Sequence, residues 1–269
     1  LQFMGHVDHK LISHLVRELL LGYVAEDGYP SRHFALRVFE RGTRETVDTS
    51  IGLSVSLDFY ASRIRPPGPH LPITKEGHHL LVAEAGFVYA VEKHMDLFKT
   101  LVDRYRGVGN IEVVYGDALE VDFPVVDKIV SNLPYSISRD ITVRFLTHGF
   151  DTAVLVYQRE FARKLASKPG DTSYRFISAL TQSCCTIEPL GNVSPAAFKP
   201  RPPVWSSIVR LRLNWKPGHE YVEFIKKLFS HRNRKLRNII ENPPPGFRDK
   251  RPRSMNPREL IELYEAAFL

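Results

Sequence analysis

One stretch decides the fold, and it reads Val125-Val126-Asp127-Lys128-Ile129-Val130-Ser131-Asn132-Leu133-Pro134-Tyr135. Its first six residues are mostly apolar and predict a short buried strand. The last four residues, from Asn132 to Tyr135, predict a turn at the C-terminal end of that strand, because the proline ring fixes its own backbone there. The turn would place a side-chain amide and an aromatic ring at the edge of a sheet.

Strand and helix signals alternate on both sides of this stretch. Strand-like apolar runs and helical spacings follow one another at 87–92, 95–105, 111–115, 141–146, 153–157 and 159–166. This β-α-β order predicts an α/β protein with a mainly parallel sheet and helices on both faces. Ligands of such sheets bind at the carboxyl ends of the strands. Glu92, Asp117 and Asn132 are expected at those ends.

The C-terminal part of the chain has a different pattern. After Ile187 we expect a hairpin with its clearest strand at 207–213, and then a helical tail with helices at 221–229 and 257–268, the last capped by Ser254 or Asn256. These signals divide the chain into two predicted domains, residues 1–214 and 215–269. Residues 55–80 include a proline-rich loop and predict an insertion of no readable structure.

Composition narrows the class of partner. The chain has 269 residues, 43% of them hydrophobic, a formal net charge of +7 and a pI of about 9.4, which favours a polyanionic partner. Its two cysteines, Cys184 and Cys185, are adjacent and cannot form a disulfide framework, which indicates a reducing compartment. No apolar run approaches the roughly 20 residues that span a bilayer. We therefore expect a cytoplasmic monomer without a membrane partner.

The Asn132-Leu133-Pro134-Tyr135 turn suits one chemical problem, the methylation of an exocyclic amine. The lone pair of adenine N6 is delocalised into the ring, so the amine is a poor nucleophile. The side-chain oxygen of Asn132 and the carbonyl of Leu133 or Pro134 can each accept one N–H and draw the nitrogen toward tetrahedral geometry. Tyr135 offers its ring face to the base.

Further motifs accompany the turn in a fixed order. They are Glu92, Gly116-Asp117-Ala118-Leu119, Tyr157-Gln158-Arg159-Glu160-Phe161, and Phe198-Lys199-Pro200-Arg201-Pro202-Pro203-Val204-Trp205-Ser206, which reads F-x-P-x-P-x-V-x-S. Together with the turn, they resemble the ribosomal RNA small-subunit adenine N6,N6-dimethyltransferases, the KsgA-like family, in its archaeal and eukaryotic style. The resemblance implies a Rossmann-like methyltransferase domain followed by a small helical RNA-binding domain.

The resemblance also implies a cofactor, S-adenosylmethionine, and residues that bind it. Glu92 matches the acid that binds both ribose hydroxyls, and Asp117 with Ala118 matches the position that binds the adenine of the cofactor. Phe198 matches the aromatic residue that stacks on the target base opposite Tyr135. Methyl transfer would be direct, with no metal, covalent intermediate or strong general base.

The N-terminal part departs from the family pattern. Gln2 matches an opening glutamine, although the motif around it differs. The glycine-rich cofactor loop is represented only by Val47-Asp48-Thr49-Ser50-Ile51-Gly52-Leu53-Ser54, in which Asp48 and Gly52 match and two serines replace glycines. We expect Gln2, Asp48 and Gly52 to contact the cofactor, together with Asn132 of the turn.

A basic segment follows the predicted catalytic domain. We expect it to contact RNA phosphates through Arg232, Arg234, Lys235, Arg237, Arg248, Lys250 and Arg251. The function implied is dimethylation of adenosines near the 3′ end of small-subunit rRNA during ribosome biogenesis, with the small ribosomal subunit as partner. Two alternatives stay open: a large-subunit rRNA adenine methylase, and a non-catalytic assembly factor whose cofactor loop has degenerated.

Overall fold

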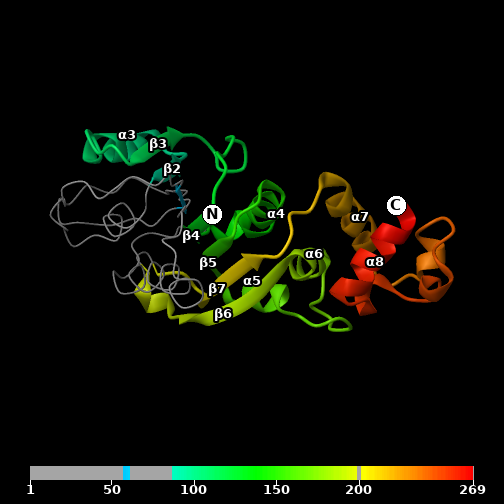
Figure 1. Cartoon of the computed structure of the whole chain (residues 1–269). Helices are drawn as coiled ribbons and strands as arrows, with labels where there is room; N and C mark the ends of the chain where they lie inside the picture. The colour runs from blue at the N-terminus through cyan, green and yellow to red at the C-terminus, as the bar shows by residue number, and fades with distance from the viewer. Residues whose placement is uncertain (1–56, 61–86, 199–200, 269) are drawn as a thin grey trace, which may run out of the picture.

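The structure is a computed structural model that describes residues 57–60, 87–198 and 201–268. Within these residues, the strands form one seven-stranded sheet in the order β3-β2-β1-β4-β5-β7-β6 (Figure 1). The strands are β1 (Leu57–Tyr60), β2 (Val88–Glu92), β3 (Ile111–Tyr115), β4 (Lys128–Asn132), β5 (Thr152–Gln158), β6 (Cys185–Val193) and β7 (Ser206–Leu213).

The sheet is mixed, which corrects the prediction of a mainly parallel sheet. The two β-α-β units pair β2 with β3 and β4 with β5 in parallel. β1 runs antiparallel to both of its neighbours, β2 and β4. The C-terminal hairpin adds β7 antiparallel to β5, and β6 antiparallel to β7. Because β1 is antiparallel to both neighbours, β2 and β4 still run in the same direction.

Six α-helices accompany the strands in the described residues, and all but α6 are close to the predicted ones. They are α3 (Met95–Arg104), α4 (Ser138–His148), α5 (Arg159–Leu165), α6 (Phe176–Cys184), α7 (His219–Ser230) and α8 (Pro257–Phe268). α3 packs on β2 and β3, and α5 packs on β5, β6 and β7. Helix α6 had not been predicted, although its apolar residues recur with helical spacing.

β4 begins three residues later than the sequence suggests. Val125 is 85% exposed and lies before the strand, whereas the five residues from Lys128 to Asn132 are all buried. The buried run of a central strand is near-continuous because helices or chain cover both faces. The shift makes Asn132 the last residue of the strand, directly before the turn.

The C-terminal helices α7 and α8 pack against α6, and Figure 1 shows them together beyond that helix, away from the sheet. The buried hydroxyl of Tyr174 donates a hydrogen bond to the carbonyl of Met255 at 3.1 Å. The amide of Gly170 donates to the carbonyl of Arg253 at 2.7 Å. These hydrogen bonds connect the chain between α5 and α6 to the C-terminal tail. The domain boundary at residue 214 stays a prediction.

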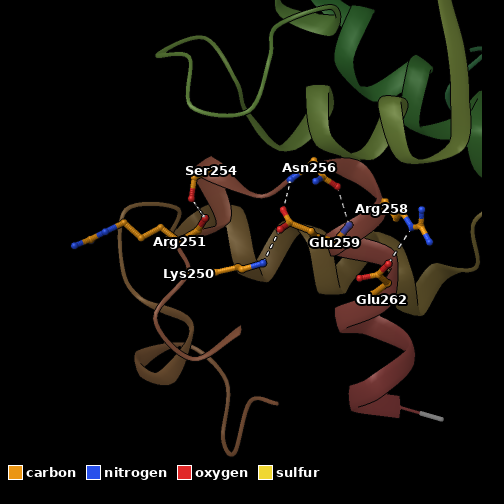
Figure 2. Close-up of polar contacts among 7 residues, drawn as sticks. All are labelled: Lys250, Arg251, Ser254, Asn256, Arg258, Glu259 and Glu262. Atoms are coloured by element: carbon orange, nitrogen blue, oxygen red, sulfur yellow. Dashed lines mark hydrogen bonds and ion pairs between the residues drawn. The ribbon is translucent and has the colours of Figure 1, made fainter. Parts of the chain in front are cut away.

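Of the two predicted caps for α8, Asn256 takes the position. The side-chain oxygen of Asn256 accepts from the amide of Glu259 at 2.9 Å, and the Glu259 carboxylate accepts from the amide of Asn256 at 2.8 Å (Figure 2). This reciprocal pair satisfies two backbone donors at the helix start. Ser254 donates instead to the carbonyl of Arg251, at 2.9 Å.

Candidate active site

The strand register brings the C-terminal ends of β2 and β4 to one edge of the sheet. β1 lies between these strands; its first residue, Leu57, pairs with Ser131 and the next residue pairs with Ala90. Glu92 and Asn132 end β2 and β4, so they lie at this edge with their backbones about 10 Å apart, two strand spacings. The predicted meeting of these two residues at one edge is therefore present in the structure.

The same edge continues on both sides. Glu92 pairs with Tyr115 at the end of β3, and Asp117 follows two residues later. At the other side, the last residue of β5, Gln158, pairs with the first residue of β7, Ser206. The edge therefore carries, in spatial order, Asp117, Glu92, Asn132 and Ser206.

Asn132 is the most unusual side chain at this edge. It is only 4% exposed, and neither its amide oxygen nor its amide nitrogen has a hydrogen-bond partner among the residues that the structure describes. Leaving a buried polar group unpaired costs roughly 1–3 kcal/mol. Such a group is expected where a ligand completes the hydrogen bonds.

The turn after Asn132 is held from two sides. The amide of Leu133 donates to the carbonyl of Val156 on β5 at 3.2 Å. The carbonyl of Pro134 accepts from the amide of Ile137 at 3.2 Å and from the hydroxyl of Ser138 at 3.4 Å. No bond to the carbonyl of Leu133 is found within the described residues. The Leu133 carbonyl is thus the better available acceptor of the two that the sequence suggested.

Tyr135 is half-buried and oriented by a hydroxyl that had no predicted role. Its phenol oxygen lies 2.6 Å from the hydroxyl oxygen of Ser206. Burial raises the pKa of Tyr135, and the hydrogen bond to Ser206 offsets only part of that effect. The phenol is therefore neutral at physiological pH. Ser206 closes the F-x-P-x-P-x-V-x-S motif, which was the available sequence signal.

Phe198 lies in the core: it is 3% exposed and its amide donates to the carbonyl of Pro195 at 3.2 Å. In this structure the ring predicted to stack on the base is therefore buried. Its ring can meet a base only after the side chains over it have moved.

The two acids at the other side of the edge, Glu92 and Asp117, both accept hydrogen bonds within the protein. Glu92 is fully buried, and its carboxylate accepts a short hydrogen bond from the amide of His94. Asp117 accepts from the ammonium of Lys93 at 2.7 Å and from the amide of Leu119 at 2.9 Å. Burial alone would raise the pKa of Asp117, but these two hydrogen bonds and the charge of Lys93 lower it below its ordinary value. Asp117 is therefore ionised at neutral pH and, with four lone-pair sites, can accept further hydrogen bonds.

Most of the predicted RNA-binding cations have internal partners. Lys235 and Arg237 both bind Asp249, at 2.7 and 2.8 Å. Lys250 binds Glu259 at the start of α8, at 2.6 Å (Figure 2). Arg232 donates to the carbonyl of Tyr174, and Arg251 to that of Asn233. Within the described residues, only two of the seven have side chains without a polar partner, Arg234 and Arg248, and both are exposed.

Three predicted cofactor residues, Gln2, Asp48 and Gly52, lie outside the described residues. In the part of the chain that the structure describes, no three or more His, Cys, Asp or Glu residues are grouped so that they could hold a metal ion. A search of the same residues finds no helix with the length and apolarity to cross a membrane.

Comparison with known proteins identifies the family. A family model described as "Ribosomal RNA adenine dimethylase" matches residues 81–266. The chain belongs to this family. It is 36% identical over 221 residues to the "Probable ribosomal RNA small subunit methyltransferase A" of Thermococcus onnurineus, covering 73% of this chain and 78% of that protein. The protein of the same name from Methanosarcina acetivorans is 38% identical over 209 residues, 70% of this chain and 78% of that one.

Solved structures agree with this fold. A dimethyladenosine transferase from Plasmodium falciparum superposes with a TM-score of 0.59 at 22% identity, covering 70% of this chain and 86% of that one. The 23S rRNA methyltransferase ErmE superposes with a TM-score of 0.62 at 22% identity, covering 99% and 100%. At such identities, these structures support the fold alone.

The prediction of a Rossmann-like methyltransferase fold and of this family is confirmed. As a family member, the protein is an adenine dimethyltransferase that acts on ribosomal RNA with S-adenosylmethionine as its cofactor. The site fits that assignment, since a buried carboxylate, Glu92, and a buried amide without a partner among the described residues, Asn132, end β2 and β4 at one edge, on two strands that run in the same direction on either side of β1.

Proposed function

We propose that this protein dimethylates N6 of adenosines near the 3′ end of small-subunit rRNA during ribosome biogenesis. It would act as a monomer in the cytoplasm, with the small ribosomal subunit as its substrate. The names of its archaeal relatives support the choice of subunit. The observation that carries the chemistry is the buried Asn132 amide, whose two polar atoms have no partner among the described residues.

Asn132 and Leu133 would bind the target amine. The oxygen of the Asn132 amide accepts one N–H of the adenine, and the Leu133 carbonyl accepts the other. The Pro134 carbonyl is less suited, because it already accepts from Ile137 and Ser138. Two acceptors on opposite sides localise the lone pair of N6 and aim it at the methyl group. The same amine can be held again after the first transfer, since one N–H remains.

Aromatic side chains would hold the extruded base. Tyr135 stacks on one face, and its hydrogen bond to Ser206 fixes the ring before the base arrives. Phe198 stacks on the opposite face once the side chains over it have moved. Stacking of an extruded base contributes about 1–3 kcal/mol per aromatic residue and tolerates different flanking sequences.

The cofactor supplies an activated methyl group on a sulfonium. Glu92 would accept hydrogen bonds from its ribose hydroxyls, and Asp117 with Ala118 would bind its adenine. Gln2, Asp48 and Gly52 are proposed to complete the binding site. Arg234 and Arg248 are the first candidates for RNA phosphates, joined by Arg232, Lys235, Arg237, Lys250 and Arg251 when their internal partners exchange for phosphate.

The test is methyl transfer from labelled S-adenosylmethionine to small ribosomal subunits that lack 3′-end adenine methylation, followed by digestion of the RNA. We expect N6,N6-dimethyladenosine with the native protein and a rate of its formation lower by roughly 10²-fold or more with Asn132→Ala. Ser131→Ala is the matched control, because Ser131 is buried next to Asn132 and its hydroxyl also has no partner among the described residues.

Two results would contradict the proposal. Label in large-subunit RNA instead of small-subunit RNA would assign the protein to the other rRNA substrate. Binding of small subunits without any transfer of label would make it a non-catalytic assembly factor.

A further inference from the structure

Trp205 and Arg159, which belong to two of the motifs quoted above, form an aromatic and cationic pair to which no role has yet been assigned. The indole of Trp205 is 44% exposed. The guanidinium of Arg159 lies over that ring, 5.6 Å from its centroid, within the range of a cation–π interaction. The amide of Arg159 also donates to the carbonyl of Trp205 at 2.9 Å, which fixes the two residues against each other.

The pair adjoins the proposed target-base site. Trp205 directly precedes Ser206, whose hydroxyl is bonded to Tyr135 of the turn. Arg159 directly follows Gln158, which pairs with Ser206 across the sheet. Both residues therefore lie at the edge that carries Asn132, on the side away from Glu92 and Asp117. A base stacked on Tyr135 would have its chain neighbour close to Trp205.

Arg159 at the Trp205 ring, and two further arginines close to this pair in the chain, favour a polyanion. Among the described residues, the guanidinium of Arg159 has no carboxylate partner, and the same holds for Arg163, one helical turn further along α5. Arg201, four residues before Trp205, is exposed and also lacks one. Glu160 lies next to Arg159 in the chain without forming an ion pair with it. A large ring beside unpaired arginines is the combination that single-stranded nucleic acid binds.

We propose that Trp205 and Arg159 form a stacking subsite for an unpaired RNA base next to the target adenosine. The indole stacks on the base, and Arg159 supports the ring and reaches the adjoining phosphate. The reference to a target adenosine rests on the function proposed above, whereas the affinity for a single-stranded base does not. Such a subsite would hold the strand while the target base is extruded.

Tryptophan emission tests the contact directly, because the chain has only two tryptophans, Trp205 and Trp215. The full-length protein is titrated with an eight-nucleotide oligoadenylate, and with polyphosphate as a probe that has charge but no base. We expect quenching by oligoadenylate, weaker quenching by polyphosphate, and loss of the difference in Trp205→Phe. Equal quenching by both probes, or the same quenching in Trp205→Phe, would overturn the proposal.

Methylation kinetics give a second measurement. Trp205→Ala should raise KM for unmethylated small subunits about tenfold, as expected for the loss of one stacked base, and should change kcat less. Trp205→Phe keeps an aromatic face and should restore most of the loss, which a merely misfolded variant would not show. Val125→Ala is the control, since Val125 is exposed before β4, at the opposite end of that strand from Asn132. A KM for Trp205→Ala equal to that of Val125→Ala would contradict the subsite.

The two proposals can fail separately. If no RNA is methylated but oligoadenylate still quenches Trp205, the proposed function is wrong and the subsite stands. If methylation depends on Asn132 but Trp205→Ala leaves both KM and quenching unchanged, the function stands and the subsite is wrong.

Discussion

Two polar regions of this molecule differ in whether their side chains have hydrogen-bond partners within the protein. At the end of β4, Asn132 is buried and its amide has no partner among the described residues. In the basic segment 231–253, five of the seven predicted RNA-binding cations already hold an internal oxygen. The first region is prepared for a ligand, whereas the second also uses its charges to hold its own loops together.

The difference has an energetic basis. An unpaired amide inside the protein is costly, so its retention indicates that a bound partner supplies the missing bonds. An exposed ion pair contributes only about 0–1 kcal/mol and can exchange its carboxylate for a phosphate at little cost. Variants of Asn132 should therefore affect catalysis without loss of stability, and variants of the basic segment should affect RNA affinity in small steps.

The largest expected effect is that of Asn132→Ala on methyl transfer. Removing the acceptor that positions N6 should lower kcat by roughly 10²-fold or more, the range found for other groups that act only in the transition state. The melting temperature should stay the same or rise, because an unsatisfied buried amide is removed. Both are measured on one preparation, by a methylation assay and by thermal unfolding.

A loss of stability in Asn132→Ala would contradict the difference drawn between the two regions. It would mean that the amide makes folding interactions, as the basic segment does. Ser131→Ala provides the reference for removing a neighbouring buried polar group, and it should retain activity.

The next effect concerns the turn that carries Asp117. A Cβ added to Gly116 would collide with Cγ1 of Val121, so Gly116→Ala must displace either the Val121 side chain or the turn. We expect a loss of about 1–3 kcal/mol in unfolding free energy, together with weaker binding of S-adenosylmethionine. Chemical denaturation and calorimetric titration measure the two quantities. Gly109→Ala is the matched control, because nothing lies within 4 Å of a Cβ added there; equal effects of the two variants would refute the steric explanation.

These results show which parts of the structure a sequence can predict. The last helix was predicted at 257–268, where the structure has it, because apolar spacing and a capping residue define a helix locally. Strand β1 was not predicted, because it lies within residues 55–80, where no structure could be read, and a strand of four residues carries no local record of which neighbours it will pair with. Helix α6 was missed, although Ile177, Leu180 and Cys184 repeat with helical spacing on its buried face.

The residues of the candidate site likewise include some that the sequence predicts and some that it does not. Glu92, Asp117 and Asn132 were predicted at one edge because strand ends can be located from apolar runs. The partners of Tyr135 and Asp117 were not predicted, because Ser206 and Lys93 meet them only through the folded sheet. The ion pairs inside the basic segment were likewise not predicted, because a sequence shows that a residue is charged but not which carboxylate lies next to it in the fold.

A smaller effect separates the free cations from the paired ones. Arg234→Gln and Arg248→Gln should each reduce the slope of log affinity against log salt by about 1 if the residue contacts a phosphate. Lys235→Gln should reduce it less, because Lys235 and Arg237 share Asp249. The hydrogen bond from Lys235 and the charge of Arg237 lower the pKa of Asp249, so it is ionised at neutral pH.

Asp249→Asn sharpens this prediction. It releases both cations and should raise RNA affinity and steepen the salt dependence, as measured by filter binding over a range of salt concentrations. A decrease in affinity instead would show that Asp249 shapes the RNA-binding surface.

The smallest effect is the dependence of stability on pH through Glu259. Burial alone would raise its pKa, but the hydrogen bonds from Lys250 and Asn256 and the charge of Lys250 lower it below the ordinary value of 4.5. A group whose pKa is depressed by folding stabilises the protein above its unfolded pKa and loses that contribution as the pH falls through the folded pKa. Because Lys250 is 41% exposed, we expect less than about 1 kcal/mol.

Glu259→Gln is therefore expected to be less stable than the native protein near neutral pH and equally stable well below the folded pKa, as measured by urea unfolding. Glu262→Gln is the control, since Glu262 also ends an ion pair, with Arg258 at 3.0 Å, but caps no helix (Figure 2). A deficit of Glu259→Gln that persists in acid would trace the loss to packing rather than charge. A pH-dependent deficit would show that the Lys250–Glu259 ion pair stabilises the C-terminal tail. An RNA phosphate would then have to displace Glu259 in order to bind Lys250.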